Sequence, residues 1–155
     1  MKRQGHQEKE EEKMKKRMER YNTIREIVRS RYIRTQRDLV DELKNRGFVC
    51  TQATVSRDIT DMGLRKLPEG VYMLAEDLHL QRMVSDLVNK VTVAGNLVVI
   101  KTSTGTAQGV AAALDAADFP SILGSVAGDD TILAIAIDEE QAKSFEAAVN
   151  KLRLK

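Results

Sequence analysis

Apolar residues near the N-terminus recur at helical spacing in two successive stretches. The first stretch begins near Met18, and its apolar residues lie three or four positions apart, at Tyr21, Ile24, Ile27 and Val28. The second follows Thr35, a favourable N-cap with Asp38 three residues later as its capping-box partner, and it ends at Gly47. The pattern therefore predicts two short helices in the first third of the chain.

A third helix is predicted directly after the second. It starts at Thr51, another N-cap, and Gly63 ends it. Apolar residues then alternate in Leu64–Leu67 and Val71–Leu74, two arms around a Pro-Glu-Gly turn, which predicts a β-hairpin. Three helices followed by a hairpin are typical of a winged helix-turn-helix, here with a short wing.

The second half of the chain predicts a different architecture. In order, its elements are a helix from Leu80, strands at 91–94 and 97–102, a helix at 106–117, strands in SILGSVA and TILAIAI, and a helix at about 139–152. A Gly95-Asn96 turn joins the first strand pair as a hairpin. We therefore predict an antiparallel sheet with helices on one face, so the fold class is α+β. Consecutive apolar residues in the strands indicate that both faces of the sheet are covered. The cover could be the domain's own helices or another subunit.

Charge divides the chain at the same place. Residues 1–75 contain 18 Lys and Arg against 12 Asp and Glu, whereas residues 76–155 contain 7 against 11. The first half is thus +6 and the second −4, which together give the net charge of +2. A basic half suggests nucleic acid as a partner. We predict a charged N-terminal arm at 1–17, disordered or extending the first helix, a DNA-binding domain at 18–75, a linker at 76–79 and a second domain with a different task at 80–155.

Composition excludes several classes of protein. One cysteine, Cys50, permits no internal disulfide, and with two histidines it forms no metal-binding cluster of recognisable spacing. No apolar run reaches the roughly 20 residues that a membrane span needs, and the N-terminus lacks the apolar core of a signal peptide. We therefore expect a cytoplasmic protein without a membrane partner.

The third predicted helix has an outer face suited to DNA. At 100° per residue, Val55, Ile59 and Met62 cluster on the inner side. The outer side holds small and polar residues with one long cation, at Ala53, Ser56, Arg57 and Thr60, and Gln52 and Thr54 lie near the N-terminal end. Small residues let a helix enter the major groove, where Arg57 could bind guanine or a phosphate and Gln52 could pair with adenine. For the stretch alone, an ordinary surface helix is about equally plausible.

The motif TQATVSRDI, followed some 70 residues later by GSVAGDDTI, resembles the bacterial arginine repressor family, whose members regulate arginine biosynthesis and catabolism. The resemblance covers nearly the whole chain from about Tyr21. It implies a winged helix-turn-helix that binds double-stranded operator DNA. It also implies a C-terminal domain that forms trimers, pairs them into hexamers and binds L-arginine as corepressor between trimers, with no other cofactor and no enzymatic activity.

The family's functional positions fall on particular residues of this sequence. For DNA the resemblance implies Gln36, Gln52, Thr54, Ser56 and Arg57, and for L-arginine it implies Gln108, Asp115, Asp129 and Asp130. A guanidinium matches carboxylates through paired, charge-assisted hydrogen bonds, so adjacent aspartates joined by Asp115 across a subunit boundary would suit arginine. Gly-Asp-Asp is also good turn chemistry, which by itself is the simpler interpretation.

Three features depart from the family pattern: Thr104 replaces a proline common in the ligand loop, the wing is short, and the charged arm is unusual.

Two alternatives to an arginine-responsive regulator remain open. One is a DNA-binding architectural or recombination accessory factor, or a paralogue insensitive to arginine. The other, an amino-acid-binding enzyme subunit, is disfavoured because the sequence has no nucleophile–base pair or phosphate-binding loop.

Overall fold

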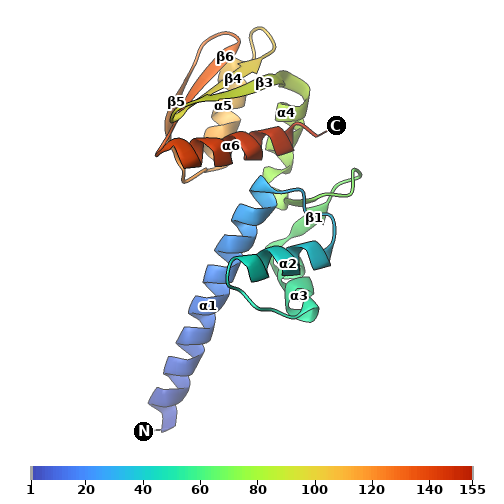
Figure 1. Ribbon diagram of the computed structural model, residues 1–155, viewed down its shortest axis with the longest axis vertical. Coiled ribbons are helices and arrows are strands. Elements are labelled where there is room, and N and C mark those ends of the chain that lie inside the picture. The colour runs from blue at the N-terminus through green and yellow to red at the C-terminus, as the bar shows by residue number, and fades with distance from the viewer. Residues whose placement is uncertain (1, 155) are drawn as a thin grey trace.

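One long helix links the two halves of the protein in the computed structural model, which describes residues 2–154 (Figure 1). This helix, α1 (Lys2–Ser30), ends against the C-terminal half, where it packs on α6 (Glu139–Leu152). Its buried residues are confined to its final third, at Ile24, Ile27 and Val28. Its first part therefore extends away from the remaining chain. Met1 and Lys155, the outer ends of the predicted arm and C-terminal domain, lie outside the described residues.

The N-terminal part of α1 extends the first helix, which was one of the two alternatives for the charged arm, the other being disorder. Residues 2–17 are helical and exposed, so the helix begins well before Met18. Lys, Glu, Arg and Gln, which have high helix propensity, make up most of this stretch. Glu11 and Glu12 precede Lys15 and Lys16 by four residues, the favourable order for helical pairs, and Glu12 lies 4.0 Å from Lys16. Local charge pairing supports this segment where an apolar stripe is missing.

Three helices and a hairpin form the N-terminal domain, as predicted. After α1 come α2 (Gln36–Asn45), α3 (Gln52–Met62), β1 (Leu64–Lys66) and β2 (Tyr72–Leu74). The two strands pair antiparallel as the short wing. The helices share one apolar core, whose most deeply buried members are Ile24, Ile27, Leu39, Leu43 and Val55. This core fixes α3 against α1 and α2 and leaves the opposite side of α3 in solvent.

The junction between the domains corrects the predicted linker at 76–79. These residues lie in a 3₁₀ turn, η1 (Ala75–Asp77), and in the first turn of α4 (Leu78–Leu87). Asp77 is buried, and Arg29 compensates its charge by donating two hydrogen bonds to the carboxylate, at 2.9 and 3.0 Å. A partner 48 residues away therefore orders a segment whose own sequence resembles a flexible connection.

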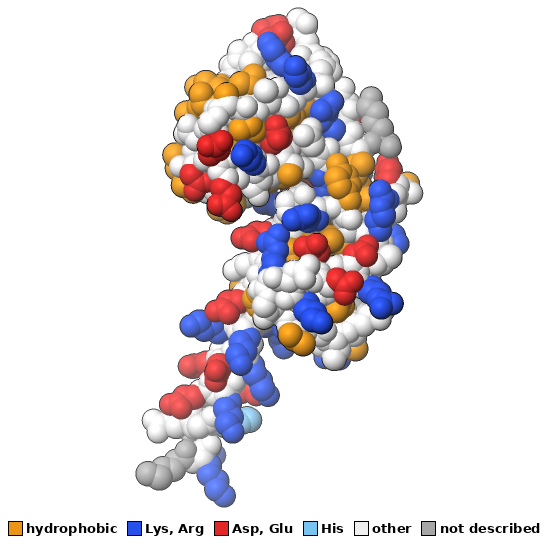
Figure 2. Space-filling model, viewed as in Figure 1, with side chains coloured by type: hydrophobic (Ala, Val, Ile, Leu, Met, Phe, Trp, Pro, Cys, Tyr) orange, Lys and Arg blue, Asp and Glu red, His pale blue; other side chains and the backbone are white. Residues whose placement is uncertain are grey.

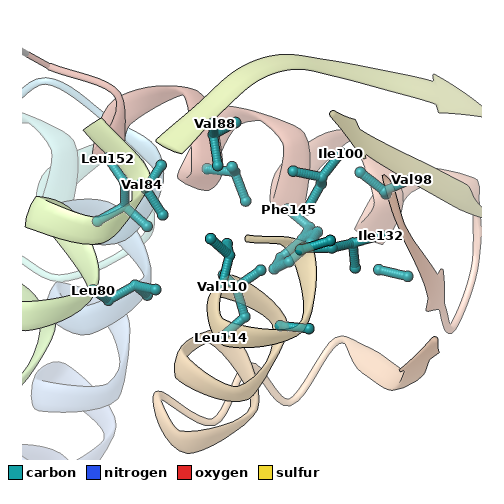
Figure 3. Close-up of a cluster of buried hydrophobic side chains, with 14 of the residues drawn as sticks. Leu80, Val84, Val88, Val98, Ile100, Val110, Leu114, Ile132, Phe145 and Leu152 are labelled. Carbon is teal, nitrogen blue, oxygen red and sulfur yellow. The ribbon is translucent and has the colours of Figure 1, made fainter. Parts of the chain in front are cut away.

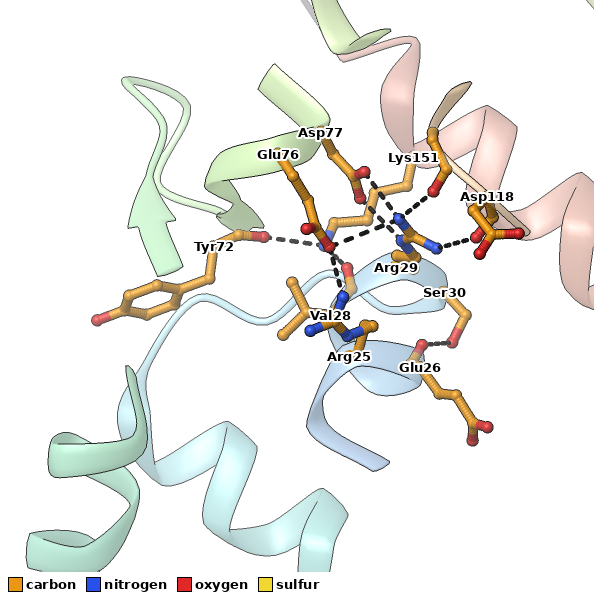
Figure 4. Close-up of polar contacts among 11 residues, drawn as sticks. Arg25, Glu26, Val28, Arg29, Ser30, Tyr72, Glu76, Asp77, Asp118 and Lys151 are labelled. Carbon is orange, nitrogen blue, oxygen red and sulfur yellow. Dashed lines mark hydrogen bonds and ion pairs between the residues drawn. The ribbon is translucent and has the colours of Figure 1, made fainter. Parts of the chain in front are cut away.

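Two cations join the halves of the molecule (Figure 4). Besides Asp77, the guanidinium of Arg29 donates to the backbone carbonyls of Ala117 and Asp118 and lies 4.5 Å from the centre of the Phe119 ring. Lys151 on α6 is buried and donates to the carbonyls of Val28 and Tyr72. Since carbonyl oxygens in the last turn of a helix lack helical partners, the bond from Lys151 satisfies the Val28 carbonyl at the end of α1.

A four-stranded antiparallel sheet forms the C-terminal domain, as predicted. Its elements are α4, β3 (Val88–Ala94), β4 (Leu97–Thr102), α5 (Ala107–Ala116), β5 (Ile122–Ala127), β6 (Thr131–Ala136) and α6. The strand order is β3-β4-β6-β5. The inward residues of β4 and β6, such as Val98, Ile100 and Ile132, pack with Val110 of α5 and Phe145 of α6 (Figure 3). The helices therefore cover one face of the sheet.

The opposite face of this sheet, the outer sheet face, is also apolar. The register aligns Leu97 with Ile135 and Val99 with Leu133, and Val126 lies beside Leu133. Val126 is 65% exposed, and Ile135 on the neighbouring strand is 36% exposed. Monomeric proteins rarely expose contiguous apolar surface of this kind, so this face is suited to contact with another chain. None of the described helices is both long and apolar enough to span a lipid bilayer.

Candidate DNA interface and ligand site

Helix α3 has well-defined ends that fix which residues it exposes. Thr51 caps the N-terminus, its hydroxyl oxygen accepting a hydrogen bond from the Thr54 amide at 3.2 Å. Gly63 ends the helix with a φ of 69°, a left-handed conformation that glycine adopts without steric cost. Between these caps, Val55, Asp58 and Ile59 are buried, so the outer side of the helix is the one predicted from the sequence.

The sequence-predicted DNA residues are gathered at the start of α2 and along α3. Gln36 donates from Nε2 to Ser56 Oγ at 3.4 Å, which joins the two helices on their polar side. Thr54 is partly buried, and its hydroxyl lies 3.0 Å from that of Thr51, so it supports the cap of α3. Gln52 and Arg57 are exposed, and neither makes a side-chain hydrogen bond to another described residue. These two side chains are free to bind an external partner.

The sequence-predicted ligand residues occupy two places in the C-terminal domain. The carbonyl of Asp129 accepts hydrogen bonds from the amides of Gly105 and Ala107, at 3.1 and 3.2 Å. The carbonyl of Asp130 accepts one from the Thr102 amide at 2.8 Å. These bonds hold the loop before α5 against the turn between β5 and β6. Gln108, the residue after Ala107, is therefore at the same end of the domain as the two exposed aspartates.

Asp115 is separated from that end within one chain. It lies seven residues after Gln108, about 10 Å along the axis of α5 and on the same exposed side. Ala112, between them on this side of α5, is exposed and has only a methyl side chain. The exposed side of α5 therefore has a polar side chain at each end and little bulk in the middle. Ser125 on β5 donates to Asp115 Oδ1 at 3.5 Å. One chain thus brings together Gln108, Asp129 and Asp130 and leaves Asp115 apart.

A hollow of about 130 Å³ opens beside Asp115. It lies between the end of α5 and strand β5, and its lining combines carboxylates with apolar surface, including Asp115, Asp118, Phe119, Leu123 and Ser125. Asp118 has a φ of 54°, unusual for a residue other than glycine, which turns the chain sharply after α5. Across residues 2–154, the structure has no group of His, Cys, Asp and Glu that could hold a metal ion.

Comparison with known proteins assigns both halves of the chain. Residues 14–80 match the family described as "Arginine repressor, DNA binding domain", and residues 84–151 match "Arginine repressor, C-terminal domain". The chain belongs to the arginine repressor family. It is 46% identical over 139 residues to the arginine repressor of Carboxydothermus hydrogenoformans, covering 83% of this chain and 93% of that protein. Identity to the arginine repressor of Thermus thermophilus is 45% over 139 residues, 83% of this chain and 85% of that protein.

These matches agree with the function predicted from sequence. Arginine repressors are arginine-responsive, DNA-binding transcriptional regulators and not enzymes, so the enzyme-subunit alternative is excluded. The arginine repressor of Alkaliphilus oremlandii, 42% identical over 143 residues, covers 86% of this chain and 96% of its own length. The family match begins at residue 14, so most of the exposed part of α1 lies outside it.

Sequence reasoning missed one pair of residues that positions α3. Arg20 on α1 donates from Nε and Nη2 to the two carboxylate oxygens of Asp58, at 2.5 and 2.8 Å. Asp58 is buried on α3 between Val55 and Ile59. This hydrogen-bonded pairing raises the pKa of Arg20 above its ordinary value, despite the opposing effect of burial. A carboxylate at an inward position of the helical wheel was the available signal, because such a group requires a cationic partner.

Proposed function

We propose that this member of the family binds palindromic operator DNA with α3 in the major groove. The free, exposed side chains of Gln52 and Arg57 on a helix face of small residues carry this proposal. Arg57 would bind a guanine edge or a phosphate, and Gln52 would pair with adenine. Gln36 at the start of α2 and Thr54 and Ser56 in the first half of α3 would hold phosphate oxygens and fix the register of α3 on the duplex. Such a regulator acts on chromosomal DNA, hence in the cytoplasm.

We propose that L-arginine is the corepressor and binds where chains meet. The carboxylates of Asp129 and Asp130 would take its guanidinium, because paired carboxylates and guanidinium groups form charge-assisted hydrogen bonds. Gln108 and Asp115 would complete the site from another chain, since α5 presents them on one exposed side but two turns apart. Each acidic turn is repelled by its counterparts in the empty assembly, and the bound cation removes that repulsion.

The assembly we propose is a hexamer of two trimers. The apolar outer sheet face provides one surface that a neighbouring chain would cover, and the exposed acidic turn provides a second, ligand-dependent one. Arginine changes DNA affinity only if it binds one assembly or arrangement more tightly than the other. A hexamer with six DNA-binding domains would then engage both halves of a palindrome at once, which raises affinity through effective concentration.

The deciding experiment is a gel-shift titration at fixed salt concentration. The probe is a palindromic duplex selected from a random pool on the wild-type protein in millimolar L-arginine. We expect L-arginine to tighten binding, whereas D-arginine and L-lysine leave it unchanged. Tight binding that is indifferent to L-arginine would contradict the corepressor assignment and favour an arginine-insensitive or architectural role. Absence of any selected sequence would contradict specific operator recognition.

A further inference from the structure

The first part of α1 forms a free helical stalk, defined here as residues 2–20. Every residue from Lys2 to Glu19 is exposed, and Arg20 is the first whose side chain reaches another element. At 1.5 Å per residue the stalk is about 27 Å long, the length of about eight base pairs of one DNA strand. Figure 1 shows it projecting beyond α2 and α3, the helices that carry the proposed DNA contacts. Most of this segment precedes the family match at residue 14.

Positive and negative side chains occupy different sides of the stalk. With 100° per residue, one arc of about 100° contains basic side chains and no carboxylate. Its members, the basic face, are Lys2, His6, Lys9, Lys13, Lys16, Arg17 and Arg20. The opposite arc holds Glu8, Glu11, Glu12 and Glu19 with a single cation, Lys15. The two remaining charged residues, Glu10 and Arg3, lie next to each other just beyond the Arg17 edge of the basic face. Figure 2 shows the same separation, with most Lys and Arg side chains along one edge of the stalk and Asp and Glu along the other.

The basic face is directed to the side of α1 on which the DNA-binding domain lies. Ile24 and Ile27, which pack into the core of that domain, fall within the same angular range of α1 as the basic face. Arg20 gives a direct check, because it belongs to the basic face and contacts Asp58 of α3. The stalk therefore extends from the side of the domain that holds α3. Its basic side chains face the same side as that helix, where bound DNA would lie.

Other uses of the stalk fit its side chains less well. A coiled coil between copies needs apolar residues sustained over three or four heptads. The stalk has two apolar side chains, Met14 and Met18, which are 63% and 56% exposed. A helix that only promotes solubility has no need to separate its charges, since mixed signs on all sides satisfy that role and add helical ion pairs.

We propose that the basic face binds the phosphate backbone of duplex DNA flanking the segment read by α3. The inference rests on the DNA-binding function and extends it to a second, sequence-independent contact. Duplex DNA carries one negative charge per roughly 1.7 Å of its axis, so a row of cations about 27 Å long spans many phosphates. Each lysine that neutralises a phosphate releases counterions, and the affinity then falls with salt more steeply than α3 alone would require.

The test compares the full-length wild type with Lys9→Gln/Lys13→Gln/Lys16→Gln. Binding is measured over a range of salt concentrations on two selected duplexes, one ending at the operator and one extended by about ten base pairs on each side. On the extended duplex we expect the variant to lose about three units of log–log salt slope per bound stalk, and at least about tenfold in affinity at low salt. On the short duplex the two proteins should bind alike.

A matched pair of single variants separates position from net charge. Lys13→Gln and Lys15→Gln remove the same charge two residues apart, but from the basic face and from the acidic side respectively. Only Lys13→Gln should flatten the salt slope on the extended duplex. Equal effects of the two variants, an unchanged slope in the triple variant, or a change of oligomeric state instead of DNA affinity would each overturn the proposal. Failure of operator binding itself is recognised separately, because the wild type would then fail on the short duplex.

Discussion

Individual arginines in the N-terminal half differ in whether their donors are already occupied. Arg20 and Arg29 each donate from Nε and Nη2 to the carboxylate of a buried aspartate. Arg57, on the outer side of α3, makes no side-chain hydrogen bond within the described chain. Nothing in residue type alone distinguishes these three roles, because Arg20 was separated from its partner by 38 positions. Their surroundings make Arg57 the arginine available to DNA.

Replacement of Arg57 by alanine should weaken operator binding by about 1 to 3 kcal/mol, the range for one arginine–guanine contact. The fold should persist because the side chain is exposed and unpartnered in the free protein. Gel-shift titration measures the loss, and Arg82→Ala, which removes an arginine from α4, serves as the control. Equal operator affinity in wild type and Arg57→Ala would remove Arg57 from the interface.

Asp130→Asn should weaken L-arginine binding and the arginine-dependent gain in DNA affinity together. The substitution keeps the side chain's shape but removes the charge that would face the ligand's guanidinium. The backbone bond between Thr102 and the Asp130 carbonyl is unaffected, so the turn should retain its geometry. Isothermal titration calorimetry measures ligand binding, with Asp86→Asn on α4 as a charge-matched control. A calorimetric affinity equal to that of the wild type would refute the role of Asp130.

At the scale of elements, apolar periodicity predicted where regular structure forms but not all of its limits. Periodicity and caps located α2, α3, the wing and α6, since a buried stripe and its terminators are local properties of sequence. The same pattern could not predict the stalk of α1, which has no apolar stripe, or the helical junction, whose order depends on Arg29. It also could not predict that backbone bonds from Gly105 and Ala107 to Asp129 place the neighbouring Gln108 at the same end of the domain as the aspartate turn, or where the proposed partner chains lie.

Two glycines should respond to alanine substitution in opposite directions: Gly63, which ends α3, and Gly109, inside α5. Gly63→Ala should lower the free energy of unfolding by about 1 kcal/mol, because a φ of 69° is strained for any residue with a Cβ. Gly109→Ala, inside α5, should raise it by about 0.5 to 1 kcal/mol, since its Cβ would meet Met83 at an ordinary 3.8 Å. Chemical denaturation measures both. The same sign of change in the two variants would contradict this account.

Over the whole molecule, the two domains are joined by charged groups placed where little water reaches. Arg29 binds Asp77, the loop after α5 and the Phe119 ring, whereas Lys151 connects α6 to the ends of α1 and β2. Burial lowers the pKa of Lys151 from 10.5 to about 8, and the nearby Asp77 charge opposes that shift. A neutral amine retains two N–H donors, which suffice for the carbonyls of Val28 and Tyr72.

Stability should therefore rise as pH increases from about 8 to 10.5. In this window the unfolded chain keeps the Lys151 proton and the folded protein releases it, so the free energy of unfolding increases with pH, by at most about 3 kcal/mol. Below pH 8 both states are protonated, and the full cost of burying the charge is present. Urea denaturation of wild type and Lys151→Met at several pH values measures the difference, in which other titrating groups cancel.

Lys143→Met, on the exposed side of α6, is the control for that experiment and should follow the wild-type pH profile. Parallel profiles for wild type and Lys151→Met would show that Lys151 is not the group responsible.

The outer sheet face has a practical consequence for a chain on its own. Val126 and Ile135 remain exposed to water until another surface covers them, so a lone chain would adsorb to plastic, glass or other exposed proteins. On successive dilution, the concentration of active protein should therefore fall by more than the dilution factor.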